Sequence, residues 1–293
     1  MSIMIGEAML VSFAGLIFRS IEHANIWQIS FYRGLVLIST IGLVLFFQYR
    51  RKVFTHIFKV GIPGLLGGAT MAGAQLCYIE SMAHTTIANT VFTMSAIPFI
   101  TALLARIFLK ERLKRGTVFT MVIAAMGIYI MIAEGLEVGS LYGNIMALAA
   151  AISFSCFAVI VRQHRGINML PVLLISGLIN ALAGLILLDN NFTISLNDLL
   201  LCVLWGIVIQ SLGFSLFILA AQSLVAAELT LFMLLEFSLG PVWVWLGVGE
   251  IPTFFTLIGG SLVLLSVSVL TISELKRGNK PLEKTGLRKQ DNF

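Results

Sequence analysis

Charged residues are scarce in this chain. They make up 11% of its 293 residues, whereas hydrophobic residues make up 58% and the mean hydropathy is +0.99. Soluble domains carry roughly one quarter charged residues, so the composition excludes a soluble globular protein. A bilayer core of about 30 Å is crossed by roughly 20 apolar residues, which leaves room for about ten membrane helices and none for a folded soluble domain.

Cysteine and histidine are also few. The three Cys lie far apart within apolar runs, and the four His lie singly near the ends of such runs (Cys77, Cys156, Cys202; His23, His56, His84, His164). This spacing predicts neither a disulfide framework nor a metal site. Walker, zinc-helix and nucleophile-elbow motifs are missing as well, so we expect no cofactor, no nucleotide-driven step and no enzyme activity. The N-terminus lacks a basic signal region, so we expect the first apolar run to be retained.

The apolar runs predict an all-α integral membrane protein with ten transmembrane helices. Charged residues, Asn or Gly-Pro pairs separate these runs. The predicted spans are 3–20, 27–48, 57–81, 85–109, 117–133, 141–161, 169–188, 199–221, 226–247 and 254–273.

The basic residues predict the orientation of these spans. Every Lys and Arg except Arg19 and Arg33 lies in an even-numbered connection, within a few residues of one, or after Glu274. Short basic loops stay cytoplasmic, so we expect a multi-pass protein of the cytoplasmic (inner) membrane with both termini inside. Residues 274–293 read as a disordered basic tail near anionic headgroups, and nucleic acid binding is not expected.

The chain also predicts an internal repeat. An offset of 139 residues pairs Gly67 with Gly206, Met94 with Met233 and Glu111 with Glu250, and the breaks between spans coincide. Residues 1–137 and 138–273 would thus be two five-helix repeats, and an odd number of spans makes the second repeat inverted. Inverted repeats are typical of secondary transporters. We expect each repeat-related Glu to cap the helix that follows it.

Several motifs resemble those of a known family. They are "WQISFYRG" at 27–34, "TTIANTVF" at 85–92, "AIPFITALLARIFLKERL" at 96–113 and "GPVWVWLGVGEIPT" at 240–253. Together they resemble the EamA-type transporters of the drug/metabolite transporter (DMT) superfamily. This resemblance implies ten helices in two inverted repeats around a central cavity, which the first four helices of each repeat line. The family includes exporters, uptake systems and exchangers.

Ionisable residues inside the predicted spans are the first candidates for a site, because each one is unfavourable in the bilayer. Glu7 is predicted at a hydrated helix end. Arg33 and Glu80 lie at similar depth, so we expect an ion pair that locks two helices, forms an outer gate or anchors a substrate carboxylate. Glu236 lies near the midplane and is the candidate for substrate binding and proton coupling; a neutral helix contact is the alternative.

Uncharged polar and aromatic residues within the spans complete the set of cavity candidates. Each of them, taken alone, is more often a helix-packing contact than a ligand. These candidates are Tyr78, Asn89, Thr93, Asn180, Gln210 and Trp243.

These features favour a secondary active transporter that moves a small organic metabolite, such as an amino acid or a related solute, by alternating access, more often outward. Its expected partners are a small-molecule substrate, the lipid bilayer and protons as coupling ion. Uptake or exchange by the same fold stays open, as does a different class, a membrane sensor or intramembrane enzyme. The sequence decides neither the substrate nor between monomer and homodimer.

Overall fold

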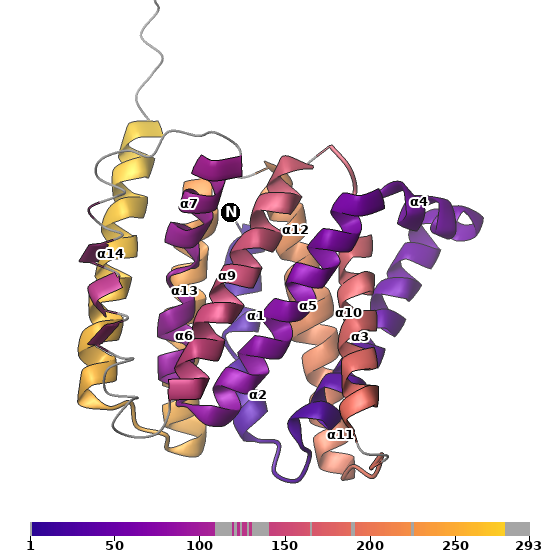
Figure 1. Ribbon diagram of the computed structural model, residues 1–293, viewed down its shortest axis with the longest axis horizontal. Coiled ribbons are helices and arrows are strands. Elements are labelled where there is room, and N and C mark those ends of the chain that lie inside the picture. The colour runs from indigo at the N-terminus through magenta and orange to yellow at the C-terminus, as the bar shows by residue number, and fades with distance from the viewer. Residues whose placement is uncertain are drawn as a thin grey trace, which may run out of the picture.

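The computed structural model describes residues 2–108, 141–164, 166–188, 191–223 and 226–278, together with 119, 122–123, 125–127 and 129–130. All regular elements within these residues are helical, and most run roughly parallel to one another across the molecule (Figure 1). The predicted all-helical class is therefore confirmed. Most of the fifth predicted span and the basic loop at 110–115 lie outside the described residues.

The described residues of the first half of the chain form eight helical elements, of which α3 and α5 are the longest. Its elements are α1 (Ser2–Val11), α2 (Ala14–Arg19), α3 (Ile26–Tyr49), η1 (Arg50–Lys52), α4 (Val53–Lys59), α5 (Gly61–His84), α6 (Ile87–Met94) and α7 (Ile97–Phe108).

The second half follows with α9 to α14. Its elements are α9 (Leu141–Gln163), α10 (Pro171–Leu187), α11 (Leu196–Leu204), the π-helical segment η2 (Trp205–Gly213), α12 (Phe214–Ser223), α13 (Ala226–Val248) and α14 (Phe254–Gly278). The sequence predicts a tail from residue 274, but α14 continues to Gly278.

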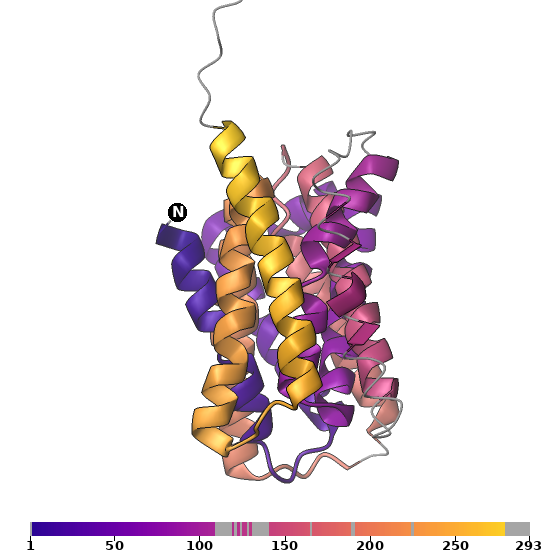
Figure 2. The same ribbon diagram turned by 90° about the vertical axis from the view of Figure 1, so that its left-hand side faces the viewer.

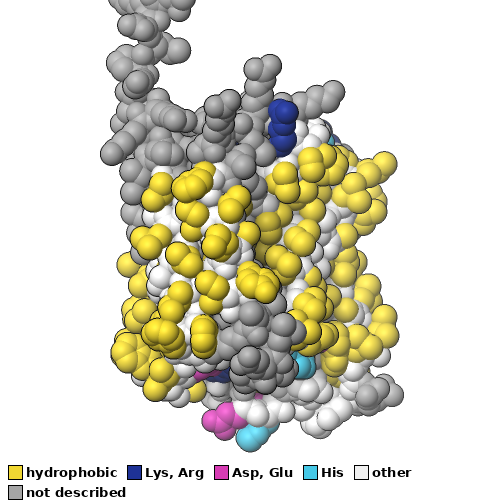
Figure 3. Space-filling view, turned by 60° about the vertical axis from the view of Figure 1, so that its left-hand side comes forward, with side chains coloured by type: hydrophobic (Ala, Val, Ile, Leu, Met, Phe, Trp, Pro, Cys, Tyr) yellow, Lys and Arg dark blue, Asp and Glu magenta, His cyan; other side chains and the backbone are white. Residues whose placement is uncertain are grey.

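Four helical stretches in the described residues are long and apolar enough to cross a membrane. They are Ile26–Tyr49, Ile87–Phe108, Leu141–Gln163 and Leu196–Ala220. Pro171–Leu187 and Phe254–Ser266 are shorter apolar helices. Large hydrophobic side chains cover the face of the bundle in Figure 3, while charged side chains gather at its ends. This surface suits contact with lipid, as in a multi-pass membrane protein.

Several spans are interrupted in mid-course. Ser12 and Phe13 separate α1 from α2, and Ser95 and Ala96 separate α6 from α7. Pro98 has no N–H to offer the carbonyl of the preceding turn, and the Ser95 hydroxyl bonds to the Phe92 carbonyl at 2.5 Å. The π-helical turns of η2 widen a third span. Interruptions of this kind are frequent at functional sites of membrane transporters.

Close packing joins the two halves of the chain. Helix α3 packs against α10, and α5 packs against both α9 and α10. A Cβ on Gly34 would lie 2.7 Å from the backbone nitrogen of Ala181, so α3 and α10 touch through their backbones. On the other side α13 packs against α14 and α1, as Figure 2 shows for α13 and α14.

Polar caps fix where the helices begin at one end of the bundle. Asn25 and Gln28 form a reciprocal capping box at the start of α3. The Ser195 hydroxyl accepts a hydrogen bond from the Asp198 N–H at the start of α11. This end, which carries Glu22, Asp198 and Glu250, is called the acidic end below. The opposite end, with Arg50 to Lys52 and Lys59, is called the basic end.

A candidate substrate cavity

A small cavity lies inside the bundle, between helices of both halves of the chain. It encloses about 60 Å³ and is lined by apolar side chains that include Met71, Phe154 and Phe237. Six polar or ionisable side chains join them: Glu7, Arg33, Gln75, Tyr78, Gln210 and Glu236. Four of the residues predicted from the sequence, Arg33, Tyr78, Gln210 and Glu236, are thus brought together here.

The interrupted spans supply much of the cavity wall. Val11 and Ala14 line it from either side of the break between α1 and α2, and Met94 and Ile97 do so at the break between α6 and α7. Trp205, Ile209 and Gln210 contribute from the π-helical segment η2. The least regular parts of these helices therefore surround one space, as in transporters whose sites are built on discontinuous helices.

Arg33 is the most unusual residue of the cavity. Only 1% of it is exposed, and its guanidinium carbon lies 4.6 Å from the ring centroid of Trp205. Its Nε and Nη2 atoms have no hydrogen-bond partner among the described residues. A buried cation without a carboxylate partner is unfavourable, and stacking on an indole ring offsets only part of that cost. Arg33 thus retains two donors for an anionic group.

Two carboxyl groups face the same cavity. Glu236, from α13, is half-buried, whereas Glu7, from α1, is 2% exposed and its Oε2 atom has no hydrogen-bond partner. The two groups are near enough to interact electrostatically. The predicted hydrated position of Glu7 is therefore wrong, because α1 packs against α13 and η2 and takes the side chain out of water.

Two glutamine side chains add further unused hydrogen-bonding groups. Neither Nε2 nor Oε1 of Gln210 has a partner in the described structure, although the residue is 1% exposed. Gln75 accepts a hydrogen bond from Asn180, and its own Nε2 is unpartnered. Asn180, which is buried on α10, does not line the cavity itself; it contacts the cavity residue Gln75. An unpaired buried polar group costs about 1–3 kcal/mol, so a ligand that pairs these groups gains accordingly.

The predicted ion pair between Arg33 and Glu80 is not formed. The Glu80 carboxylate lies 3.4 Å from His84 Nδ1 and accepts a hydrogen bond from the Tyr142 hydroxyl at 3.4 Å, near the acidic end of α5. Arg33 instead turns toward Trp205 in the cavity. Similar depth along neighbouring helices was the basis for the prediction, but the two side chains point to different surroundings.

Three other candidates also lie away from the cavity. Asn89 accepts a hydrogen bond from the Thr256 hydroxyl at 2.8 Å and donates to Asn144 at 3.3 Å. The indole of Trp243 donates to the Ser12 hydroxyl at 3.0 Å and stacks on Phe13. Thr93 is buried on α6, outside the cavity lining. Asn89 and Trp243 are helix contacts, which is the alternative that the sequence left open for them.

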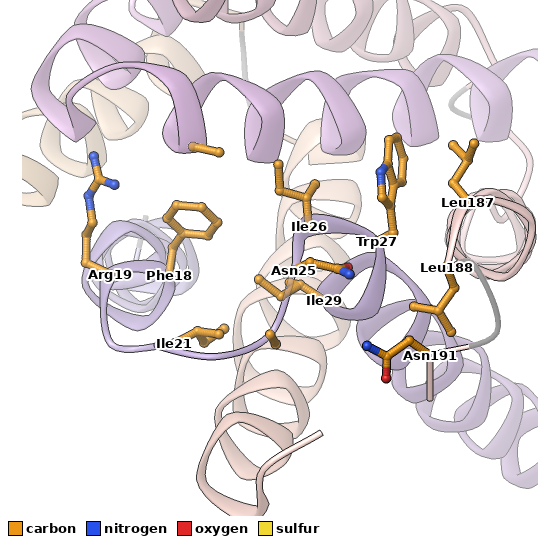
Figure 4. Close-up of a pocket in the computed structure, with 12 residues that line it drawn as sticks. Phe18, Arg19, Ile21, Asn25, Ile26, Trp27, Ile29, Leu187, Leu188 and Asn191 are labelled. Carbon is orange, nitrogen blue, oxygen red and sulfur yellow. The ribbon is translucent and has the colours of Figure 1, made fainter. Parts of the chain in front are cut away.

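A larger pocket lies beyond the cavity, toward the acidic end. It encloses about 670 Å³, with Phe18 and Arg19 on one side and Leu187 and Leu188 on the other (Figure 4). Phe18 lines this outer pocket, Trp205 lines the cavity, and their rings meet edge to face at 6.1 Å. The Phe18–Trp205 contact therefore lies where the two spaces approach each other.

The acidic end itself is held together by paired polar groups. Glu250 accepts hydrogen bonds from Arg19 Nε at 2.7 Å and from the Ile87 N–H at 2.6 Å. The sequence predicts that Glu250 caps the following helix, α14, but it instead caps α6, because the turn after α13 reaches back to that helix. Asp198 similarly accepts from the N–H groups of residues 22 to 24, which joins the α2–α3 connection to α11.

Trp205 is a cavity residue that sequence reasoning missed, and Glu7 is one that it placed at a hydrated helix end. A tryptophan in an apolar run gives no signal, because indole rings fill membrane helices as ordinary packing groups. Glu7 carried a signal, a carboxylate within a predicted span, but its position near the chain start favoured hydration.

Comparisons with known proteins agree with this architecture. The chain is similar to the pseudopaline exporter CntI of Pseudomonas aeruginosa, in strains PAO1 and UCBPP-PA14. Each of these two proteins is 24% identical to this chain over 248 residues, which cover 82% of this chain and 85% of the exporter. A solved crystal structure matches 95% of this chain and 98% of its own, with a TM-score of 0.68 and 16% identity, which supports the fold alone. Residues 1–133 match the model of the EamA-like transporter family, which confirms the resemblance that the sequence motifs indicated and supports a multi-pass membrane protein.

Proposed function

We propose that this protein is a secondary active transporter that exports a small organic metabolite across the cytoplasmic membrane. The observation that carries the proposal is the buried Arg33 guanidinium, whose Nε and Nη2 atoms have no partner among the described residues, in a cavity with two carboxyl groups and the unpartnered amide of Gln210. Such groups are unfavourable in a finished helix bundle unless a polar ligand completes them. Arg33 suits a carboxylate, so the substrate we propose is an amino acid or a related organic acid.

The sizes of the two spaces support a mechanism of alternating access. The cavity of about 60 Å³ is far smaller than the roughly 300–1,000 Å³ of small-molecule sites. The outer pocket, at about 670 Å³, is within that range. We therefore propose that helices move apart to admit the solute, and that Phe18 separates from Trp205 to let it pass to the outer pocket. The interrupted helices around the cavity provide the hinges for such movement.

The ten-helix arrangement and its orientation belong to the same proposal. Residues 1–137 and 138–273 would form inverted five-helix repeats, with the site between them. The basic end would face the cytoplasm, as would both termini, and the acidic end would face outward. A reporter fused after Asn191 should accordingly read as external.

Glu236 is the proposed proton-coupling group. It lies on the cavity wall beside Glu7, so a proton taken up in one state and released in the other would reach the substrate site. Similarity to the exporter CntI favours outward transport, while uptake or exchange would use the same cavity. An intramembrane enzyme or a sensor would bind a ligand without moving it.

Flux measurements on the purified protein in proteoliposomes test the proposal. A growth screen of overexpressing cells against amino acids and toxic metabolites selects the labelled solute. We expect net movement that a pH gradient drives, and Glu236→Gln should abolish this dependence because the amide cannot exchange a proton. Glu22→Gln, an exposed carboxylate at the acidic end, is the matched control and should behave as wild type. Binding without net movement would refute transport, and unaltered coupling in Glu236→Gln would refute the role of Glu236.

A further inference from the structure

A second, smaller pocket lies at the basic end of the bundle, far along α3 from the cavity. It encloses about 150 Å³ between the end of α3, helix α4 and the connection from α9 to α10. Its lining consists of Tyr49, His56, Lys59, Gly166, Ile167, Asn168 and Pro171. We call it the basic pocket. It brings together residues of both halves of the chain, and none of them takes part in the proposed transport site.

Hydrogen bonds orient the polar groups of this pocket. The Asn168 side chain donates from Nδ2 to the Tyr49 hydroxyl oxygen at 2.7 Å, and its Oδ1 accepts from the Leu170 N–H at 3.0 Å. The Tyr49 hydroxyl is thus held as an acceptor on one side, which leaves its own proton for a ligand. The His56 ring stacks on the Tyr49 ring, with their centroids 3.8 Å apart, and this contact fixes the plane of the phenol.

The charge of the pocket selects an anion. Lys59 is a donor with no acceptor capacity, and no acidic residue is among the lining residues. Arg50 and Arg51, both exposed, follow directly on α3. Ammonium, phenol and imidazole donors around one small space match the oxygens of a phosphate group.

The surroundings of the pocket indicate where such a phosphate comes from. Phe47 on α3 and Phe54 and Phe58 on α4 are 72%, 73% and 79% exposed. Helix α4 lies at the edge of the bundle, away from its centre (Figure 1). Large exposed aromatic side chains next to exposed bases are typical of the boundary between acyl chains and headgroups. The pocket therefore opens at the depth of the lipid headgroups.

We propose that the basic pocket binds the phosphate of an anionic phospholipid in the cytoplasmic leaflet. Lys59 and the Tyr49 hydroxyl hold the phosphate oxygens, and the acyl chains lie along the aromatic surface of α3 and α4. The bound headgroup joins α4 to the end of α3, and the hydrogen bond from Asn168 to Tyr49 links both to the α9–α10 connection. This site is independent of substrate transport.

Native mass spectrometry and thermal unfolding of the delipidated full chain test this site. The probes are dioleoyl phosphatidylglycerol, dioleoyl phosphatidylcholine and inorganic phosphate. We expect phosphatidylglycerol to bind and to raise the unfolding temperature more than either other probe. Lys59→Gln should weaken its binding about tenfold, and Tyr49→Phe should weaken it roughly fivefold, in line with a charged and a neutral hydrogen bond. Arg51→Gln, which removes a neighbouring charge outside the lining, should change it less than about twofold.

Three outcomes would overturn the assignment. Equal losses in Lys59→Gln and Arg51→Gln would show general surface attraction to anionic lipid and no defined pocket. Equal binding of the two phospholipids would remove the anionic selectivity. Equal stabilisation by inorganic phosphate would make the site one for a free anion and not for a lipid.

Discussion

At the acidic end, Glu250 accepts hydrogen bonds from both Arg19 and Ile87, and Asp198 accepts them from three successive backbone N–H groups. In the central cavity, by contrast, Arg33 keeps two donors and Gln210 keeps its whole amide without a partner in the described structure. Both regions bury charge, but only the first uses it to join segments of the chain. Unpaired groups lower stability, so their concentration in one cavity is best explained by a ligand that completes them.

The largest effect should come from removing the charge of the cavity. Arg33→Met should reduce transport roughly 10- to 100-fold, because one charged hydrogen-bonding partner of the substrate is lost. The unfolding temperature should stay unchanged or rise, because an unpaired buried cation is replaced by an apolar side chain of similar length. Arg50→Met, at an exposed site, is the control for both measurements. Normal transport by a destabilised Arg33→Met protein would assign Arg33 a structural role instead.

At the acidic end we expect a smaller effect, and we expect it on stability and not on transport. Glu250→Ala leaves the Ile87 N–H and the Nε–H of Arg19 without their acceptor, so it should destabilise the protein by about 1–3 kcal/mol. Denaturant unfolding in mixed micelles measures this change. Arg19 and Glu250 share one ion pair. The double variant Arg19→Ala with Glu250→Ala should therefore lose less free energy of unfolding than the sum of the two single variants. Additive losses would mean that the pair does not act as a unit.

The smallest effect should come from Tyr142→Phe. The Tyr142 hydroxyl lies 3.4 Å from Glu80, and the residue is 49% exposed. Such a contact competes with water, so its loss should change stability by less than about 0.5 kcal/mol. The phenylalanine ring keeps the edge-to-face contact with His84. A larger loss of stability in the same unfolding assay would show that the Tyr142–Glu80 hydrogen bond stabilises this end of the bundle.

Hydropathy and charge predicted the coarse features of this protein well. Apolar runs predict helices because backbone groups in a bilayer have to be paired within their own segment. The interruptions within spans were harder to foresee. A break at Ser12 or a π-helical turn at Trp205 leaves little trace in hydropathy, since the residues there remain apolar or small.

The candidate site was predicted only in part. Intramembrane charge pointed to Arg33 and Glu236, which do line the cavity, and polar or aromatic character added Gln210 and Tyr78. The same reasoning chose Asn89 and Trp243, which face other helices. Residue type gives the chemistry of a side chain but not the rotation of its helix, which packing against neighbours decides.

The sequence by itself determined that this chain is an all-helical membrane protein with EamA-type motifs, because local hydrophobicity, charge and motif spacing suffice for that. Only the tertiary structure decided that Arg33 stacks on Trp205 and does not pair with Glu80, that Glu7 and Glu236 line one cavity, and that Glu250 caps α6. Each of these arrangements brings together segments distant in the chain. Such contacts depend on how whole helices turn and pack, which no single segment encodes.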